Sequence, residues 1–204
     1  MAFDIERNVS RETLEKLKAC EALVRKWNPS INLIAKSTID DVWDRHIVDS
    51  LQITPLIPKN IQRIADFGSG GGFPGIVIAA FAQEHLSNVD VTLVESDKRK
   101  AVFLRTSVRE LGLNANVIDT RVESMAPLSV DFITARALSS LNNLFEMALP
   151  HSTPHTRYCF PKGRRYQEEI EEARQSWQFE IETHPSLTDN ESRILEIWDL
   201  KRVS

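Results

Sequence analysis

Hydrophobic and polar positions repeat with helical spacing in the first part of the chain. In the stretch 10–27, apolar residues recur every three or four positions behind Ser10, a residue type that commonly caps helices. They are Leu14, Leu17, Cys20, Val24 and Trp27. A second helix is expected to begin near Thr38 and to end before Pro55. We interpret residues 1–58 as an N-terminal helical extension.

From residue 61 onward, short apolar runs alternate with helical segments, which is typical of βα units and a parallel sheet. We expect strands near 61–67, 89–95, 115–119, 130–135 and 156–160. Helices are expected near 74–83, 98–111, 139–148 and 164–177. Two final β-rich segments, 179–184 and 192–200, flank a turn-rich stretch and predict an antiparallel hairpin. Residues 59–204 are therefore predicted to form one compact α/β unit.

Composition indicates an ordinary globular protein, because 42% of its 204 residues are hydrophobic and 26% are charged. The first ten residues lack the basic and then apolar order of a signal peptide, and no stretch supplies the roughly 20 apolar residues of a membrane span. Cys20 and Cys159 are expected to be reduced thiols outside any metal-ligand pattern. We expect a cytoplasmic protein without a metal or a membrane partner, and its evenly charged surface favours a monomer.

Net charge bears on possible partners. A value of −4 argues against a protein that coats nucleic acid through overall basicity. Two local basic clusters are either solvated faces or nucleic-acid contacts. One contains Arg157, Lys162, Arg164 and Arg165, and the other contains Lys98, Arg99, Lys100, Arg105 and Arg109.

A glycine-rich turn carries the clearest chemical signal. The segment DFGSGGGFPG, residues 66–75, follows a predicted strand and opens a helix, so its backbone can pass close to a ligand. Gly70, Gly72 and Gly75 satisfy G-x-G-x-x-G, and Glu95 lies 20 residues later, as in a dinucleotide-binding unit. Glu95 ends the second strand, where its carboxylate can accept both hydroxyls of a ribose.

The same turn also fits a methyl donor. Read from Gly68, the pattern is acid-x-G-x-G-x-G, with Asp66 placed to bind a water or the amino group of a methionine moiety. A dinucleotide enzyme normally needs further chain for its substrate, whereas a terminal antiparallel hairpin completes the usual methyltransferase sheet. The pattern therefore favours S-adenosylmethionine, and a class I, Rossmann-like methyltransferase fold, over a dinucleotide.

Several motifs together resemble one family. They are RKWNPSINLIAKS at 25–37, RHIVDSL at 45–51, DFGSGGGFPG at 66–75, LVESDKRKAVFL at 93–104, TRVES at 120–124, ITARAL at 133–138 and FPKGRRYQEEI at 160–170. The chain resembles the bacterial 16S ribosomal RNA guanine-N7 methyltransferases, also called glucose-inhibited division protein B. The resemblance implies S-adenosylmethionine as donor, S-adenosylhomocysteine as product, and the N7 of a guanine in the 530 loop as acceptor.

The resemblance also assigns roles to residues. It implies that Gly68, Phe73 and the neighbouring Gly70 contact the cofactor and that Val122 and Glu123 lie beside its adenine ring. Each has an alternative: Phe73 as plain core, Val122 and Glu123 as a strand-to-helix turn.

Methyl transfer to guanine N7 needs no general base, because that nitrogen carries a lone pair and no proton. We therefore expect no catalytic acid or base, only orientation of the reacting atoms. Arg136, at the end of the fourth strand, is expected at the edge of the cofactor pocket, where it assists by contacting the cofactor carboxylate or the guanine edge. A surface arginine is the alternative.

Basic residues near these motifs are expected to grip RNA phosphates. They are Arg45, His46, Lys162, Arg164 and Arg165. For His46, a position as a satisfied histidine between helix and sheet is an equal alternative. The expected partner is 16S ribosomal RNA or the small ribosomal subunit. Two other functions remain open at this point: a methyltransferase with a small-molecule or protein acceptor, and a nucleotide-binding module without catalysis.

Overall fold

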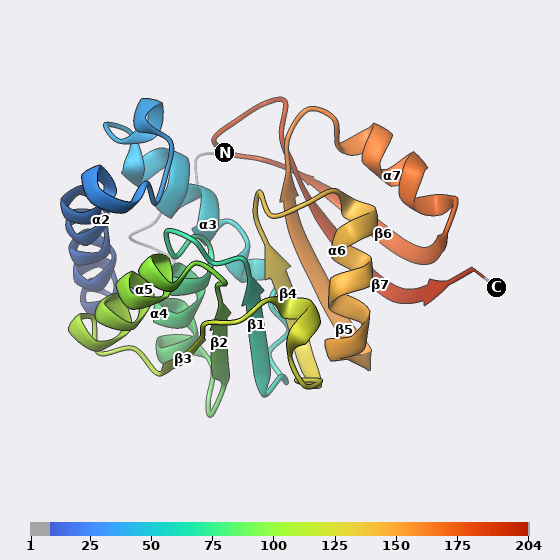
Figure 1. The fold of residues 1–204 in the computed structure, drawn as a ribbon, viewed down its shortest axis with the longest axis horizontal. Coiled ribbons are helices and arrows are strands. Elements are labelled where there is room, and N and C mark those ends of the chain that lie inside the picture. Colours follow the sequence, from blue (N-terminus) through green and yellow to red (C-terminus); the bar gives the residue numbers. More distant parts are fainter. Residues whose placement is uncertain (1–8, 204) are drawn as a thin grey trace.

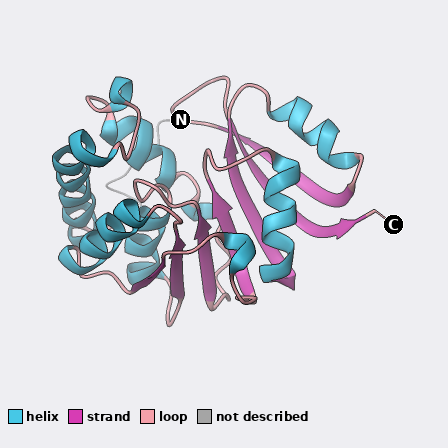
Figure 2. Cartoon of the chain, in the orientation of Figure 1, coloured by secondary structure: helices cyan, strands magenta, loops and turns pink. Residues whose placement is uncertain are grey.

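A seven-stranded sheet forms the centre of the protein, as seen in a computed structural model that describes residues 9–203 (Figures 1 and 2). The strands follow the order β3-β2-β1-β4-β5-β7-β6. They are β1 (Arg63–Phe67), β2 (Asp90–Val94), β3 (Ala115–Ile118), β4 (Val130–Ala135), β5 (Ser152–Lys162), β6 (Trp177–Pro185) and β7 (Arg193–Arg202). Strands β1 to β5 run parallel, and β7 lies antiparallel between β5 and β6.

Helices cover both faces of the sheet. They are α2 (Arg11–Ile31), α3 (Asp49–Leu51), α4 (Gly75–His85), α5 (Lys98–Glu110), α6 (Leu141–Ala148) and α7 (Tyr166–Arg174). Adjacent residues of one strand belong to different cores: Ile64 packs with the apolar side chains of α2, α4 and α5, and Ala65 packs with those of α6 and α7. Because strand side chains alternate between faces, β1 is buried from both sides. In Figure 1, α2, α4 and α5 lie on the left of the view, and α6 and α7 lie on the right.

The predicted β elements are confirmed, with longer boundaries at the end of the chain. The predicted strand at 156–160 extends over Ser152–Lys162, and the predicted hairpin is β6 with β7. The last predicted helix, 164–177, is shorter in the structure. Trp177 begins β6 instead, because its buried ring packs against α6, where its indole N–H donates to Asn142.

The N-terminal extension agrees with its prediction in part. Ser10 caps α2, since its hydroxyl accepts a hydrogen bond from the Thr13 N–H and donates to Glu84 at the end of α4. The second helix does not start at Thr38. The Thr38 hydroxyl donates to the Ala35 carbonyl and contacts His46, so Thr38 caps no helix there.

Short helical pieces replace the predicted second helix. They are Lys36–Thr38, a π-helical segment at Trp43–Val48, α3, and Thr54–Leu56. Segments with π-helical spacing are frequently found at functional sites. The proposed boundary between residues 58 and 59 stays a prediction.

Replacing Phe145 tests the core beneath α6 and α7. The centre of its fully buried ring lies 5.0 to 6.4 Å from the ring centres of Phe160, Trp177 and Phe179. Phe145→Ala should lower the free energy of unfolding by roughly 3 to 5 kcal/mol, because it removes apolar contacts and leaves a cavity. Phe145→Leu should cost clearly less. Urea denaturation measures both, and equal losses in the two variants would contradict this packing.

Candidate functional site

Two adjoining cavities open at the edge of the sheet where the parallel strands end. The larger has a volume of about 920 Å³ and lies between the N-terminal extension and the ends of β4, β5 and β7. The smaller, of about 280 Å³, lies beside the ends of β1 and β2. Open α/β sheets bind their ligands at this edge. Five residues line both cavities: Gly68, Gly70, Lys100, Ala137 and Leu138.

The glycine turn forms the floor between the cavities. Gly68 and Gly72 have φ angles of 67° and 87°, a backbone region that residues with a Cβ rarely adopt. A Cβ at Gly68 would lie 2.6 Å from a methyl carbon of Leu138, and one at Gly72 would lie 2.5 Å from Ile76. The turn therefore exposes backbone to a ligand and excludes side chains.

Asp66 lies buried beneath this turn. Within residues 9–203, neither of its carboxylate oxygens has a hydrogen-bond partner. Burial raises the pKa of Asp66 from 3.8 to about 7. A buried carboxyl group without a partner favours a ligand donor beside it, such as a water or an ammonium group. Asp66 lines neither cavity, so a contact with a water or with the amino group of S-adenosylmethionine stays a prediction.

Glu95 is positioned by backbone N–H groups at the smaller cavity. Its carboxylate accepts hydrogen bonds from Gly70 at 2.8 Å and from Asp97 at 2.7 Å. Val122 and Glu123 line the same cavity, with Val122 buried and Glu123 exposed. The buried His151 ring lies 3.1 Å from the Val122 carbonyl oxygen and holds this turn in place. An acid, a turn and a glycine backbone around one cavity fit an adenosine.

Arg136 connects the end of β4 to the N-terminal extension. Its guanidinium donates to the Arg45 carbonyl at 3.3 Å, to Asp49 Oδ2 at 3.2 Å and to His46 Nδ1 at 2.7 Å. The same group lies 5.7 Å from the centre of the Phe73 ring. Arg136 and Phe73 both line the larger cavity, and their contact with the cofactor stays a prediction. The surface-arginine alternative is wrong, because the Arg136 side chain is only 19% exposed.

Asp49 is a site residue that the sequence pattern did not predict. Its second oxygen, Oδ1, accepts from Thr188 and from Gln52, each at 2.7 Å, so Asp49 joins the extension to the β6–β7 loop as well as to β4. The signal was its place in RHIVDSL, three to four residues after Arg45 and His46. Nothing in the local period of the sequence indicates a partner 87 residues away.

His46 contacts three residues of the protein. Its ring stacks on Phe73 at 5.2 Å, Nδ1 accepts from Arg136, and Nε2 lies 2.9 Å from the Thr38 hydroxyl. Burial, followed by the nearby charges of Arg136 and Arg45, lowers the pKa of His46 from 6.5 to about 3. Both ring nitrogens have partners within the protein, so the predicted phosphate contact of His46 stays a prediction that this geometry does not favour. The alternative, a satisfied histidine, fits the structure.

Lys162 is also paired within the protein. Its ammonium group lies 2.7 Å from Glu169 and 2.7 Å from the Ser139 carbonyl oxygen, and its side chain is only 9% exposed. The predicted phosphate contact of Lys162 stays a prediction, which this pairing and low exposure do not favour. Arg45, Arg164 and Arg165 are exposed, and Arg165 pairs with Glu168.

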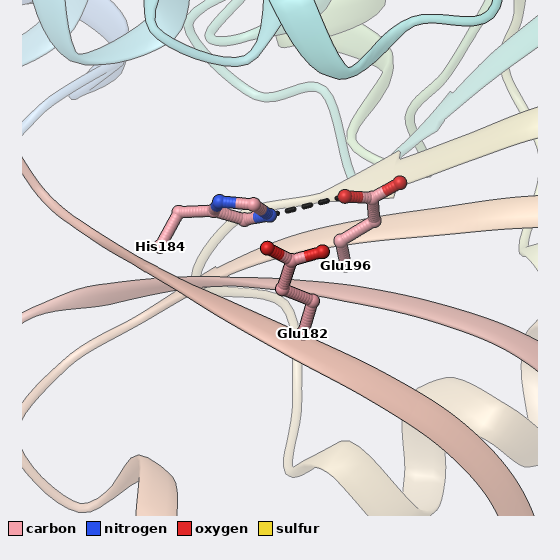
Figure 3. Close-up of side chains that lie close together, drawn as sticks. All are labelled: Glu182, His184 and Glu196. Carbon is pink, nitrogen blue, oxygen red and sulfur yellow. Dashed lines mark hydrogen bonds and ion pairs between the residues drawn. The ribbon is translucent and has the colours of Figure 1, made fainter.

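A separate cluster lies on the terminal hairpin. Figure 3 shows Glu182, His184 and Glu196, whose ligand atoms lie within 4.8 Å of one another. His184 Nε2 lies 3.0 Å from Glu196, and Arg157 lies 3.6 Å from the same carboxylate. None of the three residues lines either cavity. The expected absence of a metal site stays a prediction.

In the described part of the chain, no helix could cross a lipid bilayer.

Asp66→Asn tests the state of the buried carboxyl group. With a pKa near 7, the folded protein keeps a proton that the unfolded chain releases above about pH 4. The contribution of Asp66 to the stability of the wild type therefore falls between about pH 4 and 7, and the variant lacks this contribution. Across that range, the variant should gain about 4 kcal/mol on the wild type. Urea denaturation at several pH values measures this gain, and a difference independent of pH would contradict it.

Comparison with known proteins supports one family. Residues 13–195 match the GidB family, rRNA small subunit methyltransferase G. A ribosomal RNA small subunit methyltransferase G of Cereibacter sphaeroides is 48% identical over 196 residues, which cover 96% of this chain and 95% of the relative. The protein of that name from Brucella ovis is 48% identical over 95% of this chain and 91% of its own length.

The fold is shared with a solved methyltransferase structure. The ribosomal protein L11 methylase of Lactobacillus delbrueckii subsp. bulgaricus superposes with a TM-score of 0.60 at 17% identity, covering 78% of this chain and 79% of its own. The predicted class I methyltransferase fold, with its terminal antiparallel hairpin, is confirmed. The predicted family resemblance is confirmed as well: the chain belongs to the rRNA small subunit methyltransferase G family.

Proposed function

We propose that the protein is an S-adenosylmethionine-dependent methyltransferase acting on N7 of a guanine in 16S ribosomal RNA. The observation that carries the proposal is the pair of joined cavities, one bounded by Glu95 and the other by Arg136, with a bare glycine backbone between them. The relatives are named for methylation of small-subunit ribosomal RNA. The acceptor is assigned to the 530 loop by the motif resemblance.

Each part of the donor has a matching group in the cavities. We assign the ribose hydroxyls to Glu95 and the adenine ring to Val122 and Glu123 of the smaller cavity. The methionine part is assigned to the larger cavity, where Asp66 underlies the turn and Arg136 retains N–H groups beyond those of its three hydrogen bonds. Gly68, Gly70 and Phe73 complete the contacts. No metal is needed for this assignment.

The chemistry requires placement more than proton transfer. S-adenosylmethionine supplies an electrophilic methyl group on a sulfonium, and guanine N7 supplies a free lone pair. The chain must hold the base in line with the methyl group, and orientation of this kind can contribute on the order of 7 to 11 kcal/mol. Arg136 assists by fixing the pocket edge, and no residue acts as a general acid or base. The base must also leave its stack, which costs a few kcal/mol and least in a loop.

The RNA contact is assigned to exposed arginines at or beside the larger cavity, which Arg45 and Arg165 line. Arg45 lies on the extension, and Arg164 and Arg165 lie in the loop after β5. Their charges explain how an acidic protein attracts a polyanion locally. The small ribosomal subunit is the expected partner in the cell, and the protein is expected to act there as a cytoplasmic monomer.

The direct test is incubation with labelled S-adenosylmethionine and either small ribosomal subunits or naked 16S RNA. Label should appear in the RNA as N7-methylguanine. Label in protein, or in a small molecule without RNA, would support the alternative acceptors. Donor binding without any transfer would indicate a nucleotide-binding module. Each of these results would refute the proposal.

Removing the charges of Arg45 and Arg164 should weaken RNA binding. Arg45→Ala with Arg164→Ala should lower RNA affinity and reduce the salt dependence of binding, by a slope of about 0.7 to 1 for each phosphate that is no longer neutralised. Arg11→Ala is the matched control, because this exposed arginine follows the Ser10 cap beside Glu84, at the opposite edge of the sheet. Filter binding at several salt concentrations measures both, and unchanged slopes in the double variant would contradict the assignment.

A further inference from the structure

The loop between β4 and α6 is held rigidly at its first residue. Arg136 begins this loop, and its guanidinium is fixed by the Arg45 carbonyl, His46 and Asp49. Because Asp49 also accepts hydrogen bonds from Gln52 and Thr188, the anchor itself is braced from two elements. The start of the loop therefore has little freedom to move.

The far end of the loop is held by the ion pair between Lys162 and Glu169. Lys162 donates to the Ser139 carbonyl at 2.7 Å, and Glu169 accepts from the Leu141 N–H at 2.8 Å. Lys162 and Glu169 also pair with each other. The lysine that was expected to face RNA instead binds the backbone of this loop.

Between the two anchors, the loop presents an apolar side chain to the cavities. Ala137 has a φ angle of 54°, an uncommon backbone state for a residue with a Cβ, which persists where the surroundings enforce it. Leu138 follows and is 38% exposed, one of four large hydrophobic side chains exposed among the described residues. Its methyl groups lie on the backbone of Gly68.

Leu138 lies where the reacting atoms must meet. A donor with adenosine in the smaller cavity and methionine in the larger one places its sulfonium, which joins these two parts, at the wall that the cavities share. Of the five residues in this wall, only Lys100 and Leu138 have side chains longer than a methyl group. Lys100 is a cation, so Leu138 offers the largest apolar side chain in this wall.

We propose that Leu138 packs against the face of the acceptor guanine and holds the unstacked base with N7 toward the methyl group. The faces of a purine are apolar, whereas its edges carry the polar groups, so a branched aliphatic side chain matches the face. The rigid loop sets the position of Leu138 before RNA binds, which lowers the cost of ordering the site. The inference rests on the proposed function.

The experiment separates binding of the base from binding of the donor. The probe is a synthetic RNA hairpin of the 530 loop with 2-aminopurine, whose fluorescence rises on unstacking, in place of the acceptor guanine. It is titrated in the presence of S-adenosylhomocysteine. Calorimetry measures the affinity for S-adenosylmethionine without RNA, and methyl transfer to the unmodified hairpin gives kcat/KM. The variants are Leu138→Ala, Leu138→Asn and Leu138→Met. Leu187→Ala is the control, because Leu187 is 49% exposed and lines neither cavity.

We expect Leu138→Ala and Leu138→Asn to lose most of the fluorescence rise and to lower kcat/KM by roughly tenfold or more. Affinity for S-adenosylmethionine should change less than about twofold. Leu138→Met should keep both signals because it is apolar and of similar volume. A large loss of affinity for S-adenosylmethionine would show that Leu138 contacts the cofactor. A fluorescence rise equal to that of the wild type would show that Leu138 does not contact the base. Either result overturns the inference. If the wild type transfers no methyl group to RNA, the proposed function itself fails.

Discussion

The arrangement of the site depends on one largely buried cation, the guanidinium of Arg136. Three segments converge on it: the end of β4, the π-helical segment with His46, and α3 with Asp49. All three hydrogen-bond partners of the guanidinium belong to the extension, so moving the extension away from the sheet edge would break all three bonds. The extension is thereby fixed as one wall of the larger cavity.

Basic residues in this protein serve two separate purposes. Arg136 and Lys162 are buried and bind backbone carbonyls and carboxylates, so their charges shape the loop between β4 and α6. Arg45 and Arg164 are exposed and free to meet phosphates. Sequence position does not distinguish the two groups, since Lys162 and Arg164 lie two residues apart. The exposure of the side chain distinguishes them.

Much of the fold follows from the sequence because its signals are local. The alternation of strands and helices, the glycine turn and the Ser10 cap each depend on neighbours within a few residues. The unpredicted features depend on contacts between distant segments. Three features were not predicted: the π-helical segment, the pairing of Asp49 with Arg136, and the hydrogen bond between His46 and Arg136. They involve contacts of the extension with the end of β4 or with the β6–β7 loop, and no period in the sequence indicates such contacts.

If one donor spans both cavities with its reacting centre at their shared wall, a structure of the protein with S-adenosylhomocysteine bound will show it. We expect the ribose on Glu95, the adenine beside Val122, and the sulfur atom at the junction of Gly68 and Leu138. A molecule confined to one cavity, or with its sulfur away from this junction, would contradict this arrangement.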